Sequence, residues 1–330
     1  MGLFNRTASD DIKVSVVTPV YNVETYLPEC LESLRRQRLR GIEFICVNDG
    51  STDGSLAILQ DYARRDPRFV VIDKPNSGYG ATMNVGVSRA RGQYIGIVES
   101  DDFASPDMFK RLYRFASKND CDIVKCNFYE HDSSGDRLQE VFRGYPYKKV
   151  FDVHEDSDVM RVLPAIWAAV YRKDMLDRCG IRFNETPGAS FQDTSFVQRC
   201  WMASRRVAIL PEGYLHYRVD RTDSSVKSDK KIFEVCGEYE VTESFMREDP
   251  ERVRTFGPLL QVLKLGTYRW NYNRISNDWH EAFAERWAQE MRAAQQEGLL
   301  EQRLFDEADW TLIQELMADP KAFAAAHESI

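Results

Sequence analysis

The chain has 330 residues, of which 43% are apolar and 29% charged, a globular composition that argues against a disordered or collagen-like protein. Its 44 basic and 52 acidic side chains give a net charge of −8, which disfavours nucleic-acid binding because phosphate backbones attract basic proteins. At about 150 residues per domain, the length indicates roughly two structural units.

The cysteines and the absence of a long apolar segment predict a cytoplasmic protein. The seven cysteines are odd in number and never spaced C-x-x-C, so they fit reduced thiols better than disulfides or a zinc site. Residues 1–11 lack a signal-peptide core, and no apolar run approaches the roughly 20 residues that cross a bilayer. We expect no transmembrane segment, and association with the inner face of a membrane stays open.

The first two thirds of the sequence alternates short apolar runs with helical patterns, which is typical of a mostly parallel sheet covered by helices. The predicted strands span residues 14–18, 43–47, 69–72, 94–98, 122–128, 165–171 and 214–219. The predicted helices span residues 23–34, 54–65, 79–90, 105–116 and 191–203.

Beyond about residue 229 the sequence changes character. Gly and Pro become rare, and residues 231–248 and 280–298 have helical patterns. We therefore predict a first domain over residues 1–225 and a helical region over residues 226–330. Aromatic side chains in this region suit a lipid-linked acceptor, a partner helix such as that of a homodimer, or helix packing; they are Tyr268, Trp270, Tyr272, Trp279 and Trp287.

Polar segments follow the first two predicted strands, TPVYN at residues 18–22 and NDGSTDGS at residues 48–55. In an open α/β sheet, ligands bind beyond the carboxyl ends of the strands, so both segments would border one pocket. Tyr21 is suited to lie against a flat base, and Asp49 is suited to accept hydrogen bonds from ring N–H groups. The alternative is a turn that only leads to a helix N-cap.

Glu99, Asp101 and Asp102 crowd the end of the fourth predicted strand. Residues two apart on an extended segment point the same way, so Glu99 and Asp101 can converge on one site. Such carboxylates repel one another unless a cation lies among them, and Mg²⁺ or Mn²⁺ held jointly with a diphosphate prefers oxygen ligands. The alternative is a solvated acidic turn that caps the next helix.

Three segments carry a family resemblance: VSVVTPVYN, VNDGSTDGS and NSGYGATMNVGVSRARGQYIGIVESDD. Followed by a helix that begins with Pro, they resemble in order and spacing the nucleotide-sugar-binding half of a family 2 glycosyltransferase. The resemblance implies a GT-A fold: an α/β domain whose Rossmann-like, mostly parallel sheet is flanked by helices, here with a C-terminal helical appendage. Residues 12–128 would bind the nucleotide-sugar, and residues 129–225 would supply the acceptor side and the catalytic base.

The resemblance also implies roles for single residues. The nucleoside loop would comprise Pro19, Tyr21 and Asn22, with Asp49 reading uracil and Ser51 and Asp53 completing the loop. Asn84 and Gly86 would lie beside the ribose and diphosphate. The acids Glu99 and Asp101, with Ser100 between them and Asp102 alongside, would bind the metal and the donor sugar. Two departures are Glu99, where the family usually has Asp, and Met83, where it often has Arg.

A second set of residues matches the acceptor side of the family. Family members have Glu-Asp where this chain has Gln192 and Asp193, and the Asp is the base of an inverting transfer; the alternative is a helix-start acid favoured by the macrodipole. Trp167 resembles an acceptor-side residue or packs in the core. His216 resembles a further metal ligand or is structural, and Arg218 would neutralise phosphate or border the acceptor.

The function implied is a metal-dependent inverting glycosyltransferase that uses Mn²⁺ or Mg²⁺. It would move a hexose or N-acetylhexosamine from a UDP-sugar to a hydroxyl of a saccharide, lipid-linked or protein-linked glycan, in bacterial surface glycan synthesis. One alternative is a non-catalytic UDP-sugar-binding module, motivated by Gln192 and Met83. The other is a sugar nucleotidyltransferase, although TPVYN is not the G-x-G-x-R loop typical of that class.

Overall fold

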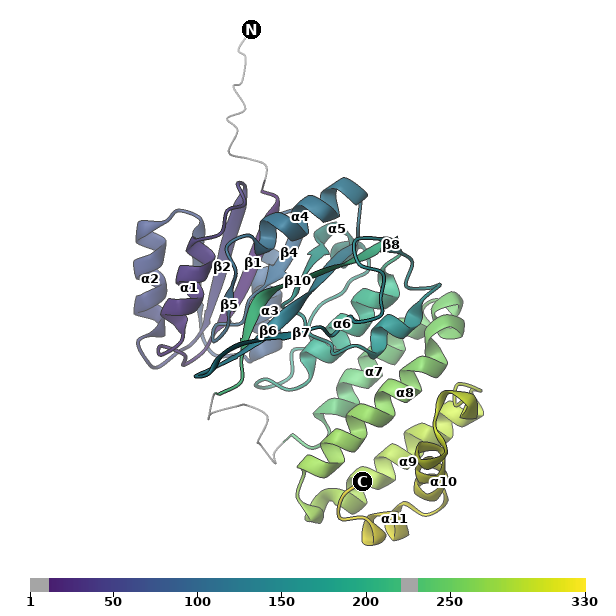
Figure 1. Ribbon diagram of the computed structural model, residues 1–330. Coiled ribbons are helices and arrows are strands. Elements are labelled where there is room, and N and C mark those ends of the chain that lie inside the picture. Colours follow the sequence, from purple (N-terminus) through teal and green to yellow (C-terminus); the bar gives the residue numbers. More distant parts are fainter. Residues whose placement is uncertain (1–11, 221–230) are drawn as a thin grey trace. The chain divides into compact units, whose positions relative to one another are not determined.

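The computed structural model describes residues 12–220 and 231–330. The chain divides into two compact units, Met1–Asp223 and Ser224–Ile330 (Figure 1). The first unit is built on a sheet, and the second is built of helices.

One sheet contains all the strands of the described residues, in the order β3-β2-β1-β4-β9-β6-β10-β5, with β7 beside β6 and β8 beside β10. β1 runs parallel to β2 and β4, β2 to β3, and β6 to β10, whereas β9 runs antiparallel to β4 and β6. The strands are β1 (Val14–Val20), β2 (Ile42–Asp49), β3 (Phe69–Lys74), β4 (Tyr94–Ile97), β5 (Phe103–Ala104), β6 (Ile123–Asp132), β7 (Gly135–Gln139), β8 (Val150–Phe151), β9 (Ala169–Arg172) and β10 (Val207–Arg218).

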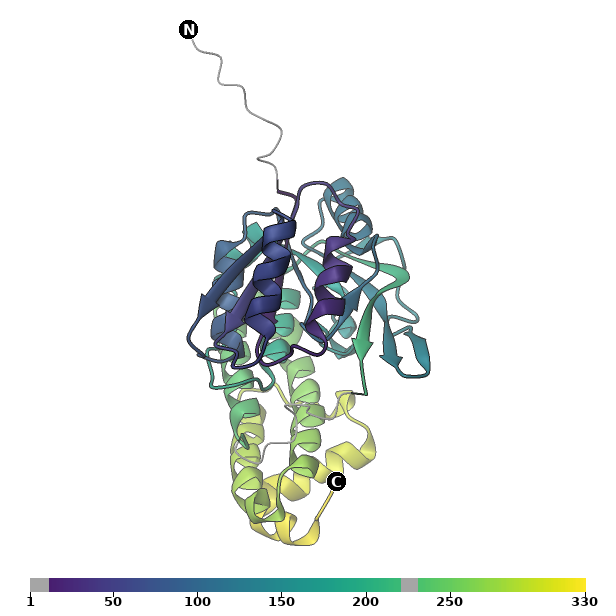
Figure 2. The ribbon, with the colours of Figure 1, turned by 90° about the vertical axis from the view of Figure 1, so that its left-hand side faces the viewer.

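Helices cover both faces of this sheet. A Cβ added to Gly96 of β4 would overlap the Phe109 ring of α4, whereas one added to Gly86 of α3 would overlap Val17 of β1, so α3 and α4 pack closely on the sheet. α1 and α2 lie side by side near β2 and β3 (Figures 1 and 2). The helices are α1 (Leu27–Arg35), α2 (Ser55–Arg65), α3 (Tyr79–Arg89), α4 (Met108–Asn119), α5 (Lys173–Arg178) and α6 (Gln192–Ala203), with a 3₁₀ turn at Ser157–Arg161.

The observed architecture confirms the predicted fold class, a mostly parallel α/β sheet flanked by helices. Every residue of β1 and β2 is buried, as expected for parallel strands covered on both faces. The prediction at 214–219 recovers only the end of β10, which begins at Val207. The register of β10 against β6 shifts between Leu210 and Leu215, and this irregularity interrupts the alternating pattern on which the prediction depends.

The second unit is helical throughout its described part, and α7 and α8 pack side by side (Figures 1 and 2). Tyr268, Tyr272 and Trp287 are fully buried, whereas Trp270 is 48% and Trp279 44% exposed. Packing of the helices therefore accounts for three of the five aromatic side chains noted in the sequence. The helices are α7 (Glu234–Arg247), α8 (Pro250–Arg274), α9 (His280–Gln296), α10 (Glu307–Ala318) and α11 (Pro320–Ala326), with 3₁₀ turns at Asn277–Trp279 and Gln302–Leu304.

Two further expectations can be compared with the structure. All seven cysteines are free thiols, and six of them are buried. Among residues 12–220 and 231–330, no helix is both long enough and apolar enough to pass through a lipid bilayer.

Candidate functional site

The candidate site lies where the parallel strands β1, β2 and β4 end, because the predicted polar segments follow these strands directly. β9 runs the opposite way, so the residues that precede it reach the same edge of the sheet. Ligands of open α/β sheets bind beyond this edge. The predicted site residues from both halves of the first unit are therefore delivered to one side.

The loops after β1 and β2 are tied to each other. The Asn22 amide donates to Ser51 Oγ at 3.1 Å, and the Thr52 amide donates to Asn22 Oδ1 at 2.8 Å. Asn22 has a positive φ of 48°, a strained conformation that clusters at functional sites. Pro19 is buried at the end of β1, and Tyr21 is 51% exposed. Of these residues, Tyr21 presents the free ring that a nucleobase needs.

Asp49 ends β2 and organises the loop after β3. Its carboxylate accepts the amides of Ser77 at 2.9 Å and Gly78 at 3.1 Å, and it pairs with the ammonium of Lys74. A carboxylate can accept about four hydrogen bonds, so these three leave capacity for one more donor. Reading of uracil by Asp49 stays a prediction.

Glu99 lies directly beyond β4 and is held by α3. The hydroxyl of Tyr79 donates a 2.7 Å hydrogen bond to Glu99 Oε1. Burial raises the pKa of Glu99 to about 8, and the charges of Asp101 and Asp193 raise it further, while the Tyr79 hydrogen bond opposes the shift. Glu99, Asp101 and Asp193 thus share one electrostatic environment, although about 90 residues separate the first two from the third in the sequence.

Asp102 is buried and has an oxygen without a partner. Its Oδ1 accepts the Arg218 amide at 2.9 Å, whereas Oδ2 meets no hydrogen-bond donor among the described residues. Burial raises the pKa of Asp102 well above its usual range, and the charge of Asp101 adds to the effect. A buried carboxylate oxygen without a donor is costly, so this position favours a bound cation.

The guanidinium of Arg218 does not face the acidic side chains. Its Nε donates to the Asp101 carbonyl at 3.1 Å, Nη2 pairs with Glu29 at 2.5 Å, and the group lies over the Tyr26 ring. These contacts fix the 99–102 segment from the outer side. Arg218 therefore positions this segment, and its contact with phosphate or acceptor stays a prediction.

Asp193 lies in the first turn of α6. Burial raises the pKa of its carboxyl group, although its Oδ1 accepts the Thr194 amide at 2.8 Å. Phe191, two residues before Asp193, is the N-cap of α6 and has a positive φ of 57°. A strained backbone and a carboxylate with a raised pKa are both common at catalytic positions.

The start of α3 contacts residues 183–188, the segment that leads to α6, and we call this set of contacts the clasp. The Tyr79 amide donates to the Gly188 carbonyl at 3.0 Å. A Cβ on Gly80 would overlap the carbonyl oxygen of Asn184, so only glycine allows this close approach. The N-S-G-Y-G motif thereby connects the donor side of the fold to the segment that carries Asp193.

Two predicted site residues take part in this clasp. The side-chain amide of Asn84 donates to the Phe183 carbonyl at 2.9 Å and accepts the Phe183 backbone amide at 2.8 Å. Gln192 is 2% exposed, and its amide donates to Thr186 Oγ1 at 2.7 Å. Contacts of Asn84 with the donor and of Gln192 with the acceptor stay predictions.

Two further residues of α3 that the sequence singles out have packing contacts. Met83, a departure from the family pattern, is fully buried, so its side chain packs in the core. Gly86, a predicted site residue, lies against Val17 of β1 and allows close packing of the helix.

His216 lies between two aromatic rings. Its ring stacks on Phe103 at 4.4 Å and on Tyr129 at 4.9 Å. Its Nε2 lies 3.1 Å from Ser105 Oγ, and its Nδ1 lies 2.9 Å from a carboxylate oxygen of Asp136. The role of His216 as a metal ligand stays a prediction.

Trp167 lies in the loop before β9 and is 8% exposed. It stacks on Tyr217 of β10, with ring centroids 5.2 Å apart and an interplanar angle of 11°. Sequence reasoning missed both Tyr217 and Tyr79. Tyr79 stands in a quoted motif between two glycines, but its partner Glu99 is 20 residues away, so only the fold reveals the pair.

The described residues contain no group of three or more His, Cys, Asp or Glu side chains arranged to hold a metal ion. A magnesium-like cation needs only one or two carboxylates when substrate phosphates complete its shell. Asp102 fits this requirement, because its Oδ2 is buried without a donor, and the predicted second carboxylate is that of Asp101.

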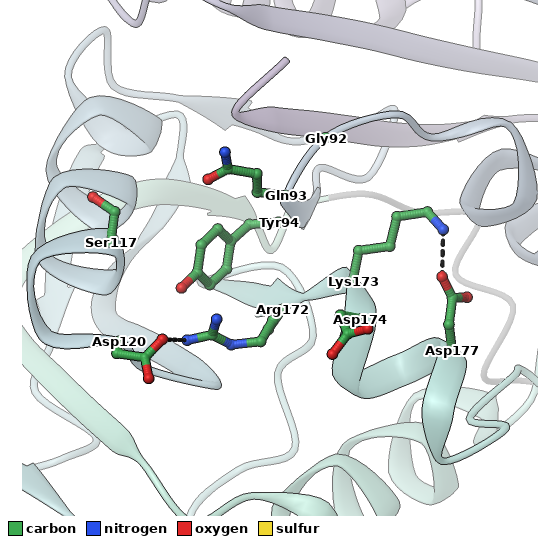
Figure 3. Close-up of a pocket in the computed structure, with 9 residues that line it drawn as sticks. All are labelled: Gly92, Gln93, Tyr94, Ser117, Asp120, Arg172, Lys173, Asp174 and Asp177. Atoms are coloured by element: carbon green, nitrogen blue, oxygen red, sulfur yellow. Dashed lines mark hydrogen bonds and ion pairs between the residues drawn. The ribbon is translucent and has the colours of Figure 1, made fainter. Parts of the chain in front are cut away.

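A cavity of about 510 Å³ opens at the opposite edge of the sheet, where β4 begins at Tyr94 and antiparallel β9 ends at Arg172 (Figure 3). Its cations are paired within the cavity, Arg172 with Asp120 at 2.6 Å and Lys173 with Asp177 at 2.5 Å. Since ligands of such sheets bind at the carboxyl edge, this cavity is not the candidate site.

Two solved structures resemble the chain. S. aureus TarS 1-349 in complex with UDP-GlcNAc has a TM-score of 0.63 at 19% identity, covering 96% of this chain and 90% of that one. The mannosyltransferase PcManGT from Pyrobaculum calidifontis, in complex with GDP-Man and Mn²⁺, has a TM-score of 0.54 at 16% identity, covering 96% and 86%. These likenesses show the GT-A fold.

Sequence comparison identifies the family. "Uncharacterized glycosyltransferase EpsJ" of Bacillus subtilis is 38% identical over 62% of this chain and 60% of its own length. "Poly(ribitol-phosphate) beta-glucosyltransferase" of Bacillus spizizenii is 41% identical over 64% of this chain and 33% of its own length. The chain thus spans less than two thirds of either relative. The family model "Glycosyl transferase family 2" matches residues 15–179, and the chain belongs to that family.

Proposed function

We propose that the protein transfers a hexose or N-acetylhexosamine from a UDP-sugar to an acceptor hydroxyl, with inversion at the anomeric carbon. The observation that carries the proposal is that Tyr79 binds both Glu99, through its hydroxyl group, and the Gly188 carbonyl of the segment that leads to Asp193, while the charge of Asp193 acts on Glu99. In this proposal, residues 12–128 bind the donor, and residues 129–225 supply the acceptor side and the base.

Asp193 acts as the base. A carboxylate whose pKa is raised by burial accepts a proton more readily than an exposed one. It takes the proton of the acceptor hydroxyl while the oxygen bonds to the anomeric carbon. The bond between that carbon and the diphosphate oxygen breaks on the opposite face, and UDP leaves with the electron pair.

The donor loops hold the nucleotide. Tyr21 offers an exposed ring to the base, and Asp49 keeps acceptor capacity for a ring N–H. The complex of TarS with UDP-GlcNAc supports a UDP-sugar because that protein shares the fold.

A divalent cation, Mn²⁺ or Mg²⁺, fits beside Asp101 and Asp102. The uncompensated Oδ2 of Asp102 and the raised pKa values of Asp102 and Glu99 support this assignment, as does the Mn²⁺ of the fold neighbour PcManGT. Such a cation neutralises negative charge on a diphosphate leaving group. Glu99 then orients the donor sugar, and Tyr79 holds Glu99 in place.

The acceptor is a surface glycan or a related polymer of a bacterium. The glucosyltransferase relative named for poly(ribitol-phosphate) supports a polymer as the acceptor, but its name does not fix the repeating unit that this chain uses. The free cysteines fit the predicted reducing cytoplasm. Contact with a membrane and a homodimer through the C-terminal helices stay predictions.

Two departures from the family pattern motivated the alternative of a binding module. Because Gln192 holds a loop and Met83 packs in the core, neither departure argues against catalysis. The test is UDP release from the glucose, galactose, N-acetylglucosamine and N-acetylgalactosamine donors with Mn²⁺, with and without saccharide acceptors. We expect UDP release that an acceptor increases. A binding module would bind UDP-sugar and release nothing, and a nucleotidyltransferase would instead form UDP-sugar from UTP and a sugar phosphate.

A further inference from the structure

Two stacked aromatic rings form a platform beside the acidic side chains. Trp167 and Tyr217 lie nearly parallel, at 11° with 5.2 Å between centroids. Tyr217 is 40% exposed, whereas Trp167 is 8% exposed. Trp167 therefore covers one face of the tyrosine ring and leaves ring surface of Tyr217 open to a ligand.

The platform is fixed from behind. Phe128 of β6 presents its ring at 84° to Trp167 and at 89° to Tyr217, with centroids 4.7 and 6.5 Å away. The backbone before Trp167 is anchored as well, because the Tyr171 hydroxyl donates to the Ile166 carbonyl at 3.1 Å and the Lys125 ammonium donates to the Ala165 carbonyl. A ring held in this way loses little conformational entropy when a ligand binds.

The sheet order places this platform on one side of the acids and the nucleotide loops on the other. The loops of Tyr21 and Asp49 follow β1 and β2, whereas Trp167 precedes β9 and Tyr217 lies on β10, with β4 between the two sets. Tyr217 lies next to the acid loop, because the amide of the following residue, Arg218, donates to Asp102 Oδ1 at 2.9 Å. The acid loop therefore separates a donor side from the aromatic platform.

We propose that the exposed face of Tyr217, supported by Trp167, binds a cyclic sugar residue of the acceptor. This inference rests on the proposed function. The C–H groups on one face of a pyranose ring form a flat apolar surface that packs on an aromatic ring. An open-chain polyol phosphate has no such fixed face. The platform thus selects acceptors that present a sugar ring next to the reacting hydroxyl.

The test measures saccharide binding directly, so that it does not depend on turnover. Saturation-transfer NMR and calorimetric titration are run with the UDP complex, using methyl β-glucoside and methyl β-N-acetylglucosaminide as cyclic probes and ribitol 5-phosphate as the open-chain probe. The variants are Tyr217→Ala and Tyr217→Phe, which keeps the ring. Trp270→Ala is the matched control, since it removes another exposed aromatic ring, 48% exposed in the helical unit.

We expect a cyclic probe to bind the original protein, Tyr217→Phe and Trp270→Ala equally. Tyr217→Ala should weaken that binding on the order of 10-fold, as for loss of one aromatic contact. Three results would overturn the inference. The cyclic probes could bind Tyr217→Ala as well as they bind the original protein. Tyr217→Ala could weaken binding of ribitol 5-phosphate more than binding of the cyclic probes, or it could weaken UDP-sugar binding and leave saccharide binding unchanged. Failure of the proposed function looks different: no donor releases UDP, while the dependence of saccharide binding on Tyr217 persists.

Discussion

The hydroxyl of Tyr79, the first residue of α3, donates a 2.7 Å hydrogen bond to Oε1 of Glu99, which follows β4. Glu is one methylene longer than Asp, and the longer side chain reaches across to the helix. Tyr79 also binds the 183–188 segment, because its backbone amide donates to the Gly188 carbonyl. Tyr79 thus connects the acid loop with the segment that leads to Asp193.

Tyr79→Phe removes this hydrogen bond without changing the ring. A hydrogen bond within a protein contributes about 0.5–1.5 kcal/mol, so we expect kcat/KM for the UDP-sugar to fall by about 2- to 10-fold while the fold persists. Steady-state kinetics with varied donor measure the effect. Tyr113→Phe is the control, because it removes a tyrosine hydrogen bond to the partly exposed amide of Gln93 away from the site. Equal losses in both variants would contradict the positioning role.

Glu99 makes the stability of the metal-free protein depend on pH. Its pKa is raised from 4.5 to about 8, so between these values the folded state holds a proton that the unfolded state has released. The free energy of unfolding should therefore fall as the pH rises through this window, with each pKa unit contributing about 1.4 kcal/mol. Urea denaturation with chelator at several pH values measures the slope. Glu99→Gln should flatten it, and an unchanged slope would contradict the assignment.

Gly80→Ala should disrupt the clasp between α3 and the 183–188 segment, because its Cβ would overlap the Asn184 carbonyl oxygen. We expect a loss of more than about 2 kcal/mol in unfolding free energy, together with a loss of transfer activity. Gly266→Ala is the control, since no described atom beyond its own helix lies within 4 Å of the added Cβ, and it should stabilise α8 by up to about 1 kcal/mol. Thermal denaturation and UDP release are measured for both variants. Unchanged stability and activity in Gly80→Ala would contradict the role of the clasp.

Chelation tests the cation assignment. We expect Mn²⁺ to tighten UDP binding on the order of 10-fold, equivalent to about 1.4 kcal/mol, and EDTA to reverse the gain. Asp102→Asn keeps the shape of the side chain and its contact with the Arg218 amide but removes the charge, so it should abolish the response to Mn²⁺. Titration calorimetry with UDP measures both effects. Binding that ignores EDTA would exclude Asp102 as a metal ligand.

The sequence predicts the fold where regular patterns are long. The apolar runs at β1 to β4 and the amphipathic pattern at α4 indicate their elements directly. The two-residue strands β5 and β8 are too short to carry a period. The long helix α8 is missed because its sequence has no clear apolar face and contains Pro258.

The site is predictable in its acids but not in its scaffold. Glu99, Asp102 and Asp193 are found from position and motif, since carboxylates at strand and helix ends are chemically distinctive. The partner of Asn84 is Phe183, 99 residues away, and such pairs follow from tertiary packing alone. The resemblance implies a metal-ligand role for His216, whereas the stacking of its ring on Phe103 and Tyr129 follows from tertiary packing.

Asp193→Asn tests the central claim most directly. Removal of a general base lowers turnover by about 10²–10⁴-fold, so we expect kcat for transfer to fall by that amount while the dissociation constant of UDP stays within about twofold. Asp174→Asn, which changes an exposed carboxylate of the same unit, should leave both values unchanged. The measurement is UDP release with saturating UDP-sugar and acceptor, alongside UDP titration. Turnover that survives in Asp193→Asn would contradict its assignment as the base.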